Sequence, residues 1–222
     1  MSQDLKLILF DVDGTLADSQ NAISSAMESA FMGVGLPAPA RPEILSIVGL
    51  SLPLAIADLA SEQDDRTQSQ LVEGYKRAYM QARLRAGADH SPLFPGAAEI
   101  LKELNAVPEY LLGVATGKSQ RGLDALIAAH GLECFVTRQV ADHHPSKPHP
   151  SMIFAALAET GVEPQNAVMI GDTAFDIEMG RAAGVATVAV TWGYHQAETL
   201  GADHTISGFQ ELKPLLQKIW KV

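Results

Sequence analysis

The sequence lacks several features that would place the protein in a membrane or outside the cell. It has 222 residues with one cysteine, Cys134, and only 6% aromatic residues. A single cysteine excludes an internal disulfide framework and fits a reducing compartment. No apolar stretch approaches the roughly 18 residues of a membrane-spanning helix, and no basic segment followed by an apolar one opens the chain as in a secretory leader. We therefore expect a cytoplasmic protein that does not contact a membrane.

Positive charge is also scarce. There are 16 lysines and arginines against 26 aspartates and glutamates, and the formal net charge is −10. This balance argues against a broad basic surface for nucleic acid or for an anionic membrane. An acidic protein that binds phosphate must do so locally, with a metal ion and one or two placed lysines. The partner we expect is a small phosphorylated metabolite, and the sequence carries no signal of oligomeric state.

Short apolar runs alternate with helical patterns along most of the chain. Strands are predicted at residues 5–10, 110–116, 167–171 and 185–191, with a weaker one at 135–140. The helices between the later strands have apolar residues at a period of 3.6, and each is expected to end in a glycine. This alternation predicts an α/β fold, a doubly wound parallel sheet with helices on both faces.

The first connection between strands is far too long for a simple crossover. It runs from residue 10 to residue 110, whereas a crossover needs little more than a dozen residues. Apolar residues recur at helical spacing over 22–31 and 71–82, with shorter patterns near 44–48 and 54–60. We predict a helical cap domain over residues 17–90, inserted into an α/β core formed by residues 1–16 and 91–222. An insertion at this point is placed to close over a site as a lid.

Two carboxylates follow the first predicted strand directly. Asp11 and Asp13 lie at its carboxyl end, which is where open α/β sheets bind ligands. Carboxylates this close repel each other unless a cation, a proton or a lysine compensates them. The pattern indicates chemistry on a phosphate with a divalent metal ion. The alternative is an ordinary Asp-Gly turn after a strand.

Three further polar groups follow other predicted strands or loops. Thr116 and Gly117 begin a Thr-Gly-Lys-Ser turn that can bind phosphate oxygens. Lys147 lies in a segment held by prolines, where a lysine favours an anionic partner. Asp172 and Asp176 are four residues apart across a turn into a helix, a spacing that can place both near one cation. The alternatives are helix caps for the turn residues and aspartates, and a solvated loop for the lysine.

In their order and spacing, these residues resemble the four motifs of the haloacid dehalogenase-like hydrolase superfamily. The helical insertion is similar to that of the subfamily that contains phosphoglycolate phosphatases. The resemblance implies that Asp11 is the nucleophile and forms an aspartyl-phosphate. It implies that Asp13 protonates the leaving alcohol and then deprotonates the attacking water. It also implies a Mg²⁺ ion held by Asp11, the main-chain carbonyl of Asp13, and Asp172.

The remaining motif residues receive supporting roles from the same resemblance. Thr116 and the main chain of Gly117 bind a phosphoryl oxygen, and Lys147 neutralises the nucleophile and the phosphate together. Asp176 orients either Lys147 or a metal-bound water. One departure from the family pattern is Gly117, because many relatives have an asparagine there. Residues 192–195 follow the last predicted strand at the same carboxyl edge of the sheet. They either flank the site or form a packed loop.

The predicted activity is a Mg²⁺-dependent phosphatase that hydrolyses a small phosphate monoester, with phosphoglycolate as the leading substrate. The alternatives are a phosphomutase or phosphotransferase, a nucleotide or pyrophosphate phosphatase of the same family, and a binding protein that has lost turnover. A mutase is disfavoured because residues 48–52 of the cap offer no cation for a second phosphate. In the family that the sequence resembles, dehalogenases lack the second aspartate, so the resemblance at Asp13 argues against a dehalogenase. Phosphonate-cleaving members of that family use a lysine of the cap, and residues 19–35 contain none.

Overall fold

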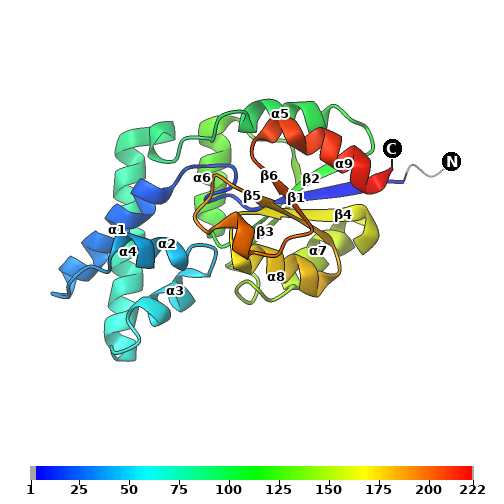
Figure 1. Ribbon diagram of the computed structural model, residues 1–222. Helices are drawn as coiled ribbons and strands as arrows, with labels where there is room; N and C mark the ends of the chain where they lie inside the picture. Colours follow the sequence, from blue (N-terminus) through cyan, green and yellow to red (C-terminus); the bar gives the residue numbers. More distant parts are fainter. Residues whose placement is uncertain (1–3, 222) are drawn as a thin grey trace.

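A parallel sheet of six strands forms the centre of the computed structural model, which describes residues 4–221 (Figure 1). The order across the sheet is β3-β2-β1-β4-β5-β6. Strands β2 and β3 therefore extend the sheet on one side of β1, and β4, β5 and β6 extend it on the other. This is a doubly wound fold, as predicted, and its reversal point lies between β1 and β4. The strands are β1 Lys6–Phe10, β2 Tyr110–Thr116, β3 Phe135–Val140, β4 Ala167–Gly171, β5 Ala186–Val190 and β6 His204–Ile206.

Helices cover both faces of the sheet because the side chains of each strand alternate between them. In β1, Ile8 and Phe10 join the apolar core on one face, while Leu7 and Leu9 join the core on the other. In Figure 1, α5 and α9 lie on one side of the sheet, and α7 and α8 lie on the other. The core helices are α5 Ala97–Asn105, α6 Gln120–His130, α7 Ser151–Thr160, α8 Ala174–Ala183 and α9 Leu212–Trp220.

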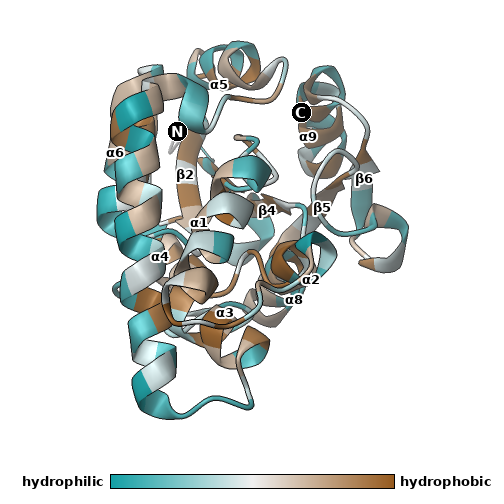
Figure 2. Ribbon diagram, turned by 90° about the vertical axis from the view of Figure 1, so that its left-hand side faces the viewer, coloured by the Kyte–Doolittle hydropathy of each residue, from teal (hydrophilic) through white to brown (hydrophobic). Residues whose placement is uncertain are grey.

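The long first connection folds into helices, as predicted. They are α1 Gln20–Gly33, α2 Arg41–Ser46, α3 Leu52–Leu59 and α4 Asp65–Ala86. These helices share an apolar core of their own, which includes Met27, Phe31, Ile44, Ile56 and Leu71. Figure 2 views the molecule from this side and shows apolar turns of α3 beside α4, which is largely hydrophilic. We refer to α1–α4 and the loops that join them as the cap.

The two chain segments that join the cap to the sheet pair with each other. The Asp18 N–H donates to the Pro92 carbonyl at 2.8 Å, and the Phe94 N–H donates to the Leu16 carbonyl at 2.9 Å. The two connecting segments therefore lie side by side, and the cap is attached to the core by a narrow connection at the carboxyl end of β1. The domain limits given above, at residues 16/17 and 90/91, remain a prediction.

Some local predictions differ from the structure. Helices α6 and α7 end at Gly131 and Gly161, both with positive φ. Helix α5 instead ends at Asn105 without a glycine, and Pro108 three residues later prevents the helix from continuing. Strand β6 was not predicted, because its three residues are too few for an apolar pattern. Within residues 4–221, no helix is both long enough and apolar enough to span a bilayer.

Candidate active site

Three aspartates meet at the reversal point of the sheet. Asp11 follows β1 and Asp172 follows β4, and because these strands are neighbours the two carboxylates lie close together. One carboxylate oxygen each from Asp11, Asp172 and Asp176 lies within 4.8 Å of the others, and all three residues are buried. Burial raises the pKa of Asp11 to about 6, helped by the charge of Asp176 and opposed by Lys147. Burial, followed by the charges of Asp176 and Asp11, raises the pKa of Asp172 well above its ordinary value.

The residues after Asp13 hold Asp172 in place. The Thr15 hydroxyl donates to Asp172 Oδ1 at 2.9 Å, and the Tyr194 N–H donates to Oδ2 at 2.9 Å. Gly14 has a φ of +86°, and a Cβ at this position would collide with the Asp172 carboxylate. The Asp-Gly-Thr sequence therefore supplies both the space for this carboxylate and one of its donors. Tyr194 belongs to segment 192–195, which flanks the site.

Lys147 is the cation of the cluster, and its side chain is completely buried. Its Nζ donates to Asp11 Oδ1 at 2.8 Å and to Asp176 Oδ1 at 2.6 Å. Burial by itself lowers the pKa of Lys147, but the charges of the two aspartates outweigh it and the pKa is raised. The other oxygen of Asp176 accepts from the Thr173 N–H at 3.1 Å and from its hydroxyl at 2.7 Å. Both oxygens of Asp176 are thus engaged, one of them with Lys147.

One oxygen of this cluster has no protein partner. Asp11 Oδ2 is buried and accepts no hydrogen bond from any residue between 4 and 221. A buried carboxylate oxygen without a donor is costly unless a cation or a proton compensates it. Carboxylate oxygens are the ligands that Mg²⁺ prefers. The cluster of Asp11, Asp172 and Asp176 therefore fits a divalent cation.

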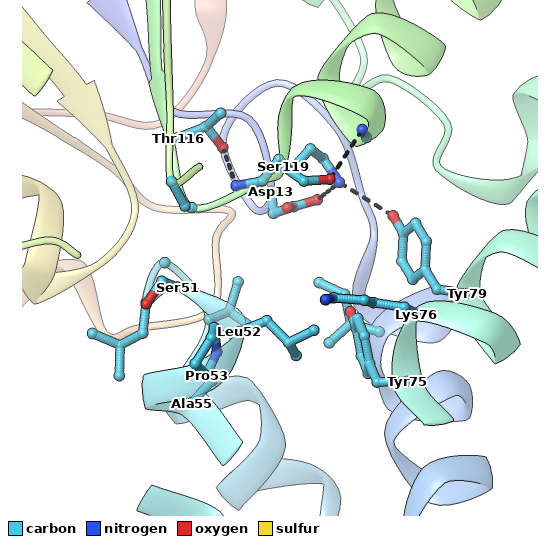
Figure 3. A pocket seen from close by; sticks show the side chains of 18 of the residues that line it. Asp13, Ser51, Leu52, Pro53, Ala55, Tyr75, Lys76, Tyr79, Thr116 and Ser119 are labelled. Carbon is cyan, nitrogen blue, oxygen red and sulfur yellow. Dashed lines mark hydrogen bonds and ion pairs between the residues drawn. The ribbon is translucent and has the colours of Figure 1, made fainter. Parts of the chain in front are cut away.

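Asp13 forms an ion pair that was not predicted from the sequence. Lys118 Nζ lies 2.8 Å from Asp13 Oδ1 and donates to the Tyr79 hydroxyl at 3.1 Å (Figure 3). Burial alone lowers the pKa of Lys118, but Asp13 and Tyr79 outweigh it and the pKa is raised. Because Tyr79 belongs to α4, this contact links the cap to Asp13. Lys118 follows Thr116 and Gly117 in the same turn, yet its spacing does not indicate which carboxylate it meets.

The turn after β2 places Thr116 and Ser119 differently. Thr116 is the last residue of β2 and is buried, and its hydroxyl accepts from the Lys118 N–H at 3.3 Å. Ser119 is the residue that caps α6, where its hydroxyl accepts from the Gly122 N–H at 3.2 Å. The helix-cap alternative is therefore confirmed for Ser119, whereas Thr116 lies at the strand end beside Asp13.

The loop between α2 and α3 lies directly against this turn. A Cβ at Gly117 would be 2.6 Å from the Gly49 carbonyl oxygen and 2.8 Å from that of Leu50. In the same loop the Ser51 N–H donates to the Ser146 hydroxyl at 2.7 Å. The cap is thus closed onto the core, and Gly117 is the position that lets its loop approach.

Restoring the family asparagine at this position tests the closure. Gly117→Asn is expected to lower kcat/KM by about 10- to 100-fold, because the side chain displaces the cap loop by a distance on the order of an ångström. The backbone at Gly117 does not need a positive φ, so the variant is expected to fold. The control is Gly33→Asn, at an exposed position where a Cβ would meet nothing. Equal activity of both variants in a steady-state assay would show that the contact is unimportant.

A cavity of about 680 Å³ lies between the cap and the core (Figure 3). Asp11, Asp13 and Thr116 line its core side. Its cap side is mostly apolar, and the cap cations that line it, Lys76, Arg77 and Arg83, come from α4. Residues 48–52 offer no cap cation; in the structure α4 provides the cap cations instead.

A parallel α/β core with an inserted helical cap and an aspartate cluster at the strand ends defines a capped hydrolase of the haloacid dehalogenase type. Residues 8–190 match the family model described as haloacid dehalogenase-like hydrolase. The chain belongs to this family.

Curated relatives and solved structures agree with this assignment. The chain is 34% identical to the phosphoglycolate phosphatase of Chromobacterium violaceum, over 96% of this chain and 97% of that one. It is also 34% identical to the Dickeya dadantii protein named "Probable phosphatase IndB", over 88% and 85%. A Haemophilus somnus structure described as a predicted phosphoglycolate phosphatase shares the fold, with a TM-score of 0.86 at 23% identity, covering 98% of this chain and 100% of that one. The protein is therefore a phosphatase of the haloacid dehalogenase-like family.

Proposed function

We propose that the protein is a Mg²⁺-dependent phosphatase that hydrolyses small phosphate monoesters through an aspartyl-phosphate on Asp11. The observation that carries this proposal is the state of the Asp11 carboxylate. It is buried, one oxygen is held by Lys147 at 2.8 Å, and the other has no hydrogen-bond donor among the described residues. A carboxylate fixed in this way is oriented for attack and faces the cavity.

In the proposed reaction the protein residues move the phosphoryl group in two steps. A carboxylate oxygen of Asp11 attacks phosphorus, the bond to the ester oxygen breaks, and the leaving oxygen takes a proton from Asp13. Water then attacks the aspartyl-phosphate and gives a proton to Asp13, which releases phosphate and regenerates Asp11. Lys147 balances negative charge on Asp11 and the phosphoryl group. Lys118 holds the Asp13 carboxylate at the cavity wall.

The aspartate cluster would hold the metal ion. Asp11 and Asp172 supply carboxylate oxygens, and the resemblance adds the main-chain carbonyl of Asp13. When bound, Mg²⁺ offsets the negative charge of the phosphate as the carboxylate approaches. Asp176 accepts hydrogen bonds from Lys147 and Thr173, and its proposed role is to orient Lys147.

The specific substrate prediction, phosphoglycolate, is supported by the names of relatives at about 30% identity. A phosphomutase is the second candidate, because Lys76 gives the cap a cation that faces the cavity. Appearance of the phosphoryl group on an acceptor alcohol, instead of free phosphate alone, would favour the mutase.

Phosphate release with and without Mg²⁺ tests the proposed function. We expect release from a panel of small phosphate esters to stop in EDTA and to return with excess Mg²⁺. Mg²⁺ is also expected to raise the unfolding temperature of the wild type, because it binds only the folded cluster. The Asp172→Asn variant is expected to lose most of that increase. The metal site would be contradicted if phosphate release in EDTA equalled that in Mg²⁺. It would also be contradicted if Mg²⁺ raised the unfolding temperatures of the wild type and Asp172→Asn equally.

A further inference from the structure

The cavity is much larger than a phosphoglycolate molecule needs. Its 680 Å³ equals the share of about twenty waters in the liquid, at roughly 30 Å³ each. The volume does not result from an open cap, because the loop carbonyls of Gly49 and Leu50 already lie against Gly117. The leaving group of phosphoglycolate is a two-carbon acid. It would leave most of this volume filled with water.

The walls of this space are apolar on the side that faces the leaving group. In Figure 3, Leu52, Pro53 and Ala55 of α3 lie across the cavity from Asp13 and Thr116. Tyr75 lines it from α4, and Met27 lines it from α1. Binding is favourable when an apolar part of the ligand displaces water from apolar cavity walls. A substrate with a hydrocarbon or aromatic body would use them, whereas glycolate would not.

A cation lies at the cap side of the same space. The Lys76 side chain extends from α4 into the cavity in Figure 3. Among residues 4–221 it forms an ion pair only with Glu73, at 2.9 Å on the same helix, and both side chains are more than half exposed. An exposed pair of this kind is weak, so Lys76 remains able to bind an anion on the substrate.

We propose that the preferred substrate is the phosphate monoester of an alcohol with an apolar body about the size of a benzene ring and an acidic group at its far end. This inference rests on the proposed function and specifies its substrate class. The phosphate lies at Asp11, the apolar body lies against Leu52 and its neighbours, and the acid lies at Lys76. Phosphoglycolate, which lacks the apolar body, is then hydrolysed as a poorer substrate outside this class.

A panel of three esters of primary alcohols tests this class. They are phosphoglycolate, benzyl phosphate, and benzyl phosphate with a carboxylate at the para position. We expect kcat/KM to be at least about tenfold higher for carboxybenzyl phosphate than for phosphoglycolate, with benzyl phosphate between them. Equal or higher kcat/KM for phosphoglycolate would overturn the substrate class and leave the phosphatase intact. Release from none of the esters with Mg²⁺ present would overturn both proposals.

Two matched pairs of variants separate the apolar wall from the cation. Leu52→Trp fills the cavity and is expected to lower the ratio of kcat/KM for carboxybenzyl phosphate over phosphoglycolate about tenfold or more. Leu54→Trp, on the same helix but 52% exposed and outside the cavity lining, should leave that ratio unchanged. Lys76→Gln is expected to lower the ratio for carboxybenzyl over benzyl phosphate, whereas Arg85→Gln on the exposed side of α4 should not. Ratios unchanged by Leu52→Trp and Lys76→Gln would contradict the proposal.

Discussion

Asp11→Asn is expected to lower kcat by about 10⁴-fold or more, because an amide cannot serve as the nucleophile and losses of this size follow removal of a nucleophile in other hydrolases. The variant should still fold. Asparagine has nearly the shape of aspartate, and it removes one of the crowded negative charges around Asp172 and Asp176. The measurement is steady-state phosphate release with saturating Mg²⁺.

The matched control is Asp58→Asn, an exposed aspartate on α3. Its kcat should stay within about twofold of the wild type, because surface substitutions away from the site change little. The unfolding temperatures of both variants need to be close to that of the wild type for the comparison to count. If folded Asp11→Asn kept more than a tenth of the activity, Asp11 would not be the nucleophile.

Lys147→Met is expected to destabilise the protein strongly as well as inactivate it. The substitution leaves Asp11 and Asp176 buried without their cation, and breaking a buried ion pair in this way costs about 3–5 kcal/mol. Urea unfolding measured in EDTA reports this loss directly. Activity should fall by a factor on the order of 10² or more, because the charge that faces the phosphoryl group is removed.

The control for this prediction is Lys213→Met, which breaks an ion pair with Glu103 at the protein surface. Exposed pairs contribute about 1 kcal/mol or less, so its free energy of unfolding should stay near that of the wild type. The double variant Lys147→Met/Asp176→Asn should recover part of the lost stability, because one stranded carboxylate is gone. Equal losses for Lys147→Met and Lys213→Met would contradict the buried cluster.

Much of the fold could be predicted because each of its main strands is a short, continuous apolar run. Five of the six strands in the described chain lie within one residue of the predicted limits. The cap helices could be predicted because a crossover does not need a hundred residues. Strand β6 and helix α9 were not predicted. The strand is too short for an apolar pattern, and no prediction was made for the segment that contains the helix.

The candidate site was predictable to the extent that its residues follow strand ends. Asp11 and Asp172 meet because β1 and β4 are neighbours. The partner of Lys118 could not be predicted, because Asp13 and Tyr79 come from distant parts of the chain and meet only when the cap closes. The space needed at Gly117 depends in the same way on a loop of the cap. Contacts of this kind depend on how the cap lies against the core, which the local sequence does not encode.

The proposed mechanism requires the transfer of a phosphoryl group to Asp11. The most direct test uses the Asp13→Asn variant with an aryl phosphate and Mg²⁺. An aryl leaving group needs little help from an acid, so the first step survives while hydrolysis of the intermediate slows. The reaction is quenched in acid within one turnover, and the peptides are analysed by mass spectrometry. We predict one phosphoryl group on the peptide that contains Asp11, at Asp11 itself, and none in the matched sample with EDTA. Release of phosphate without that modification, or a phosphoryl group on another residue, would contradict the account.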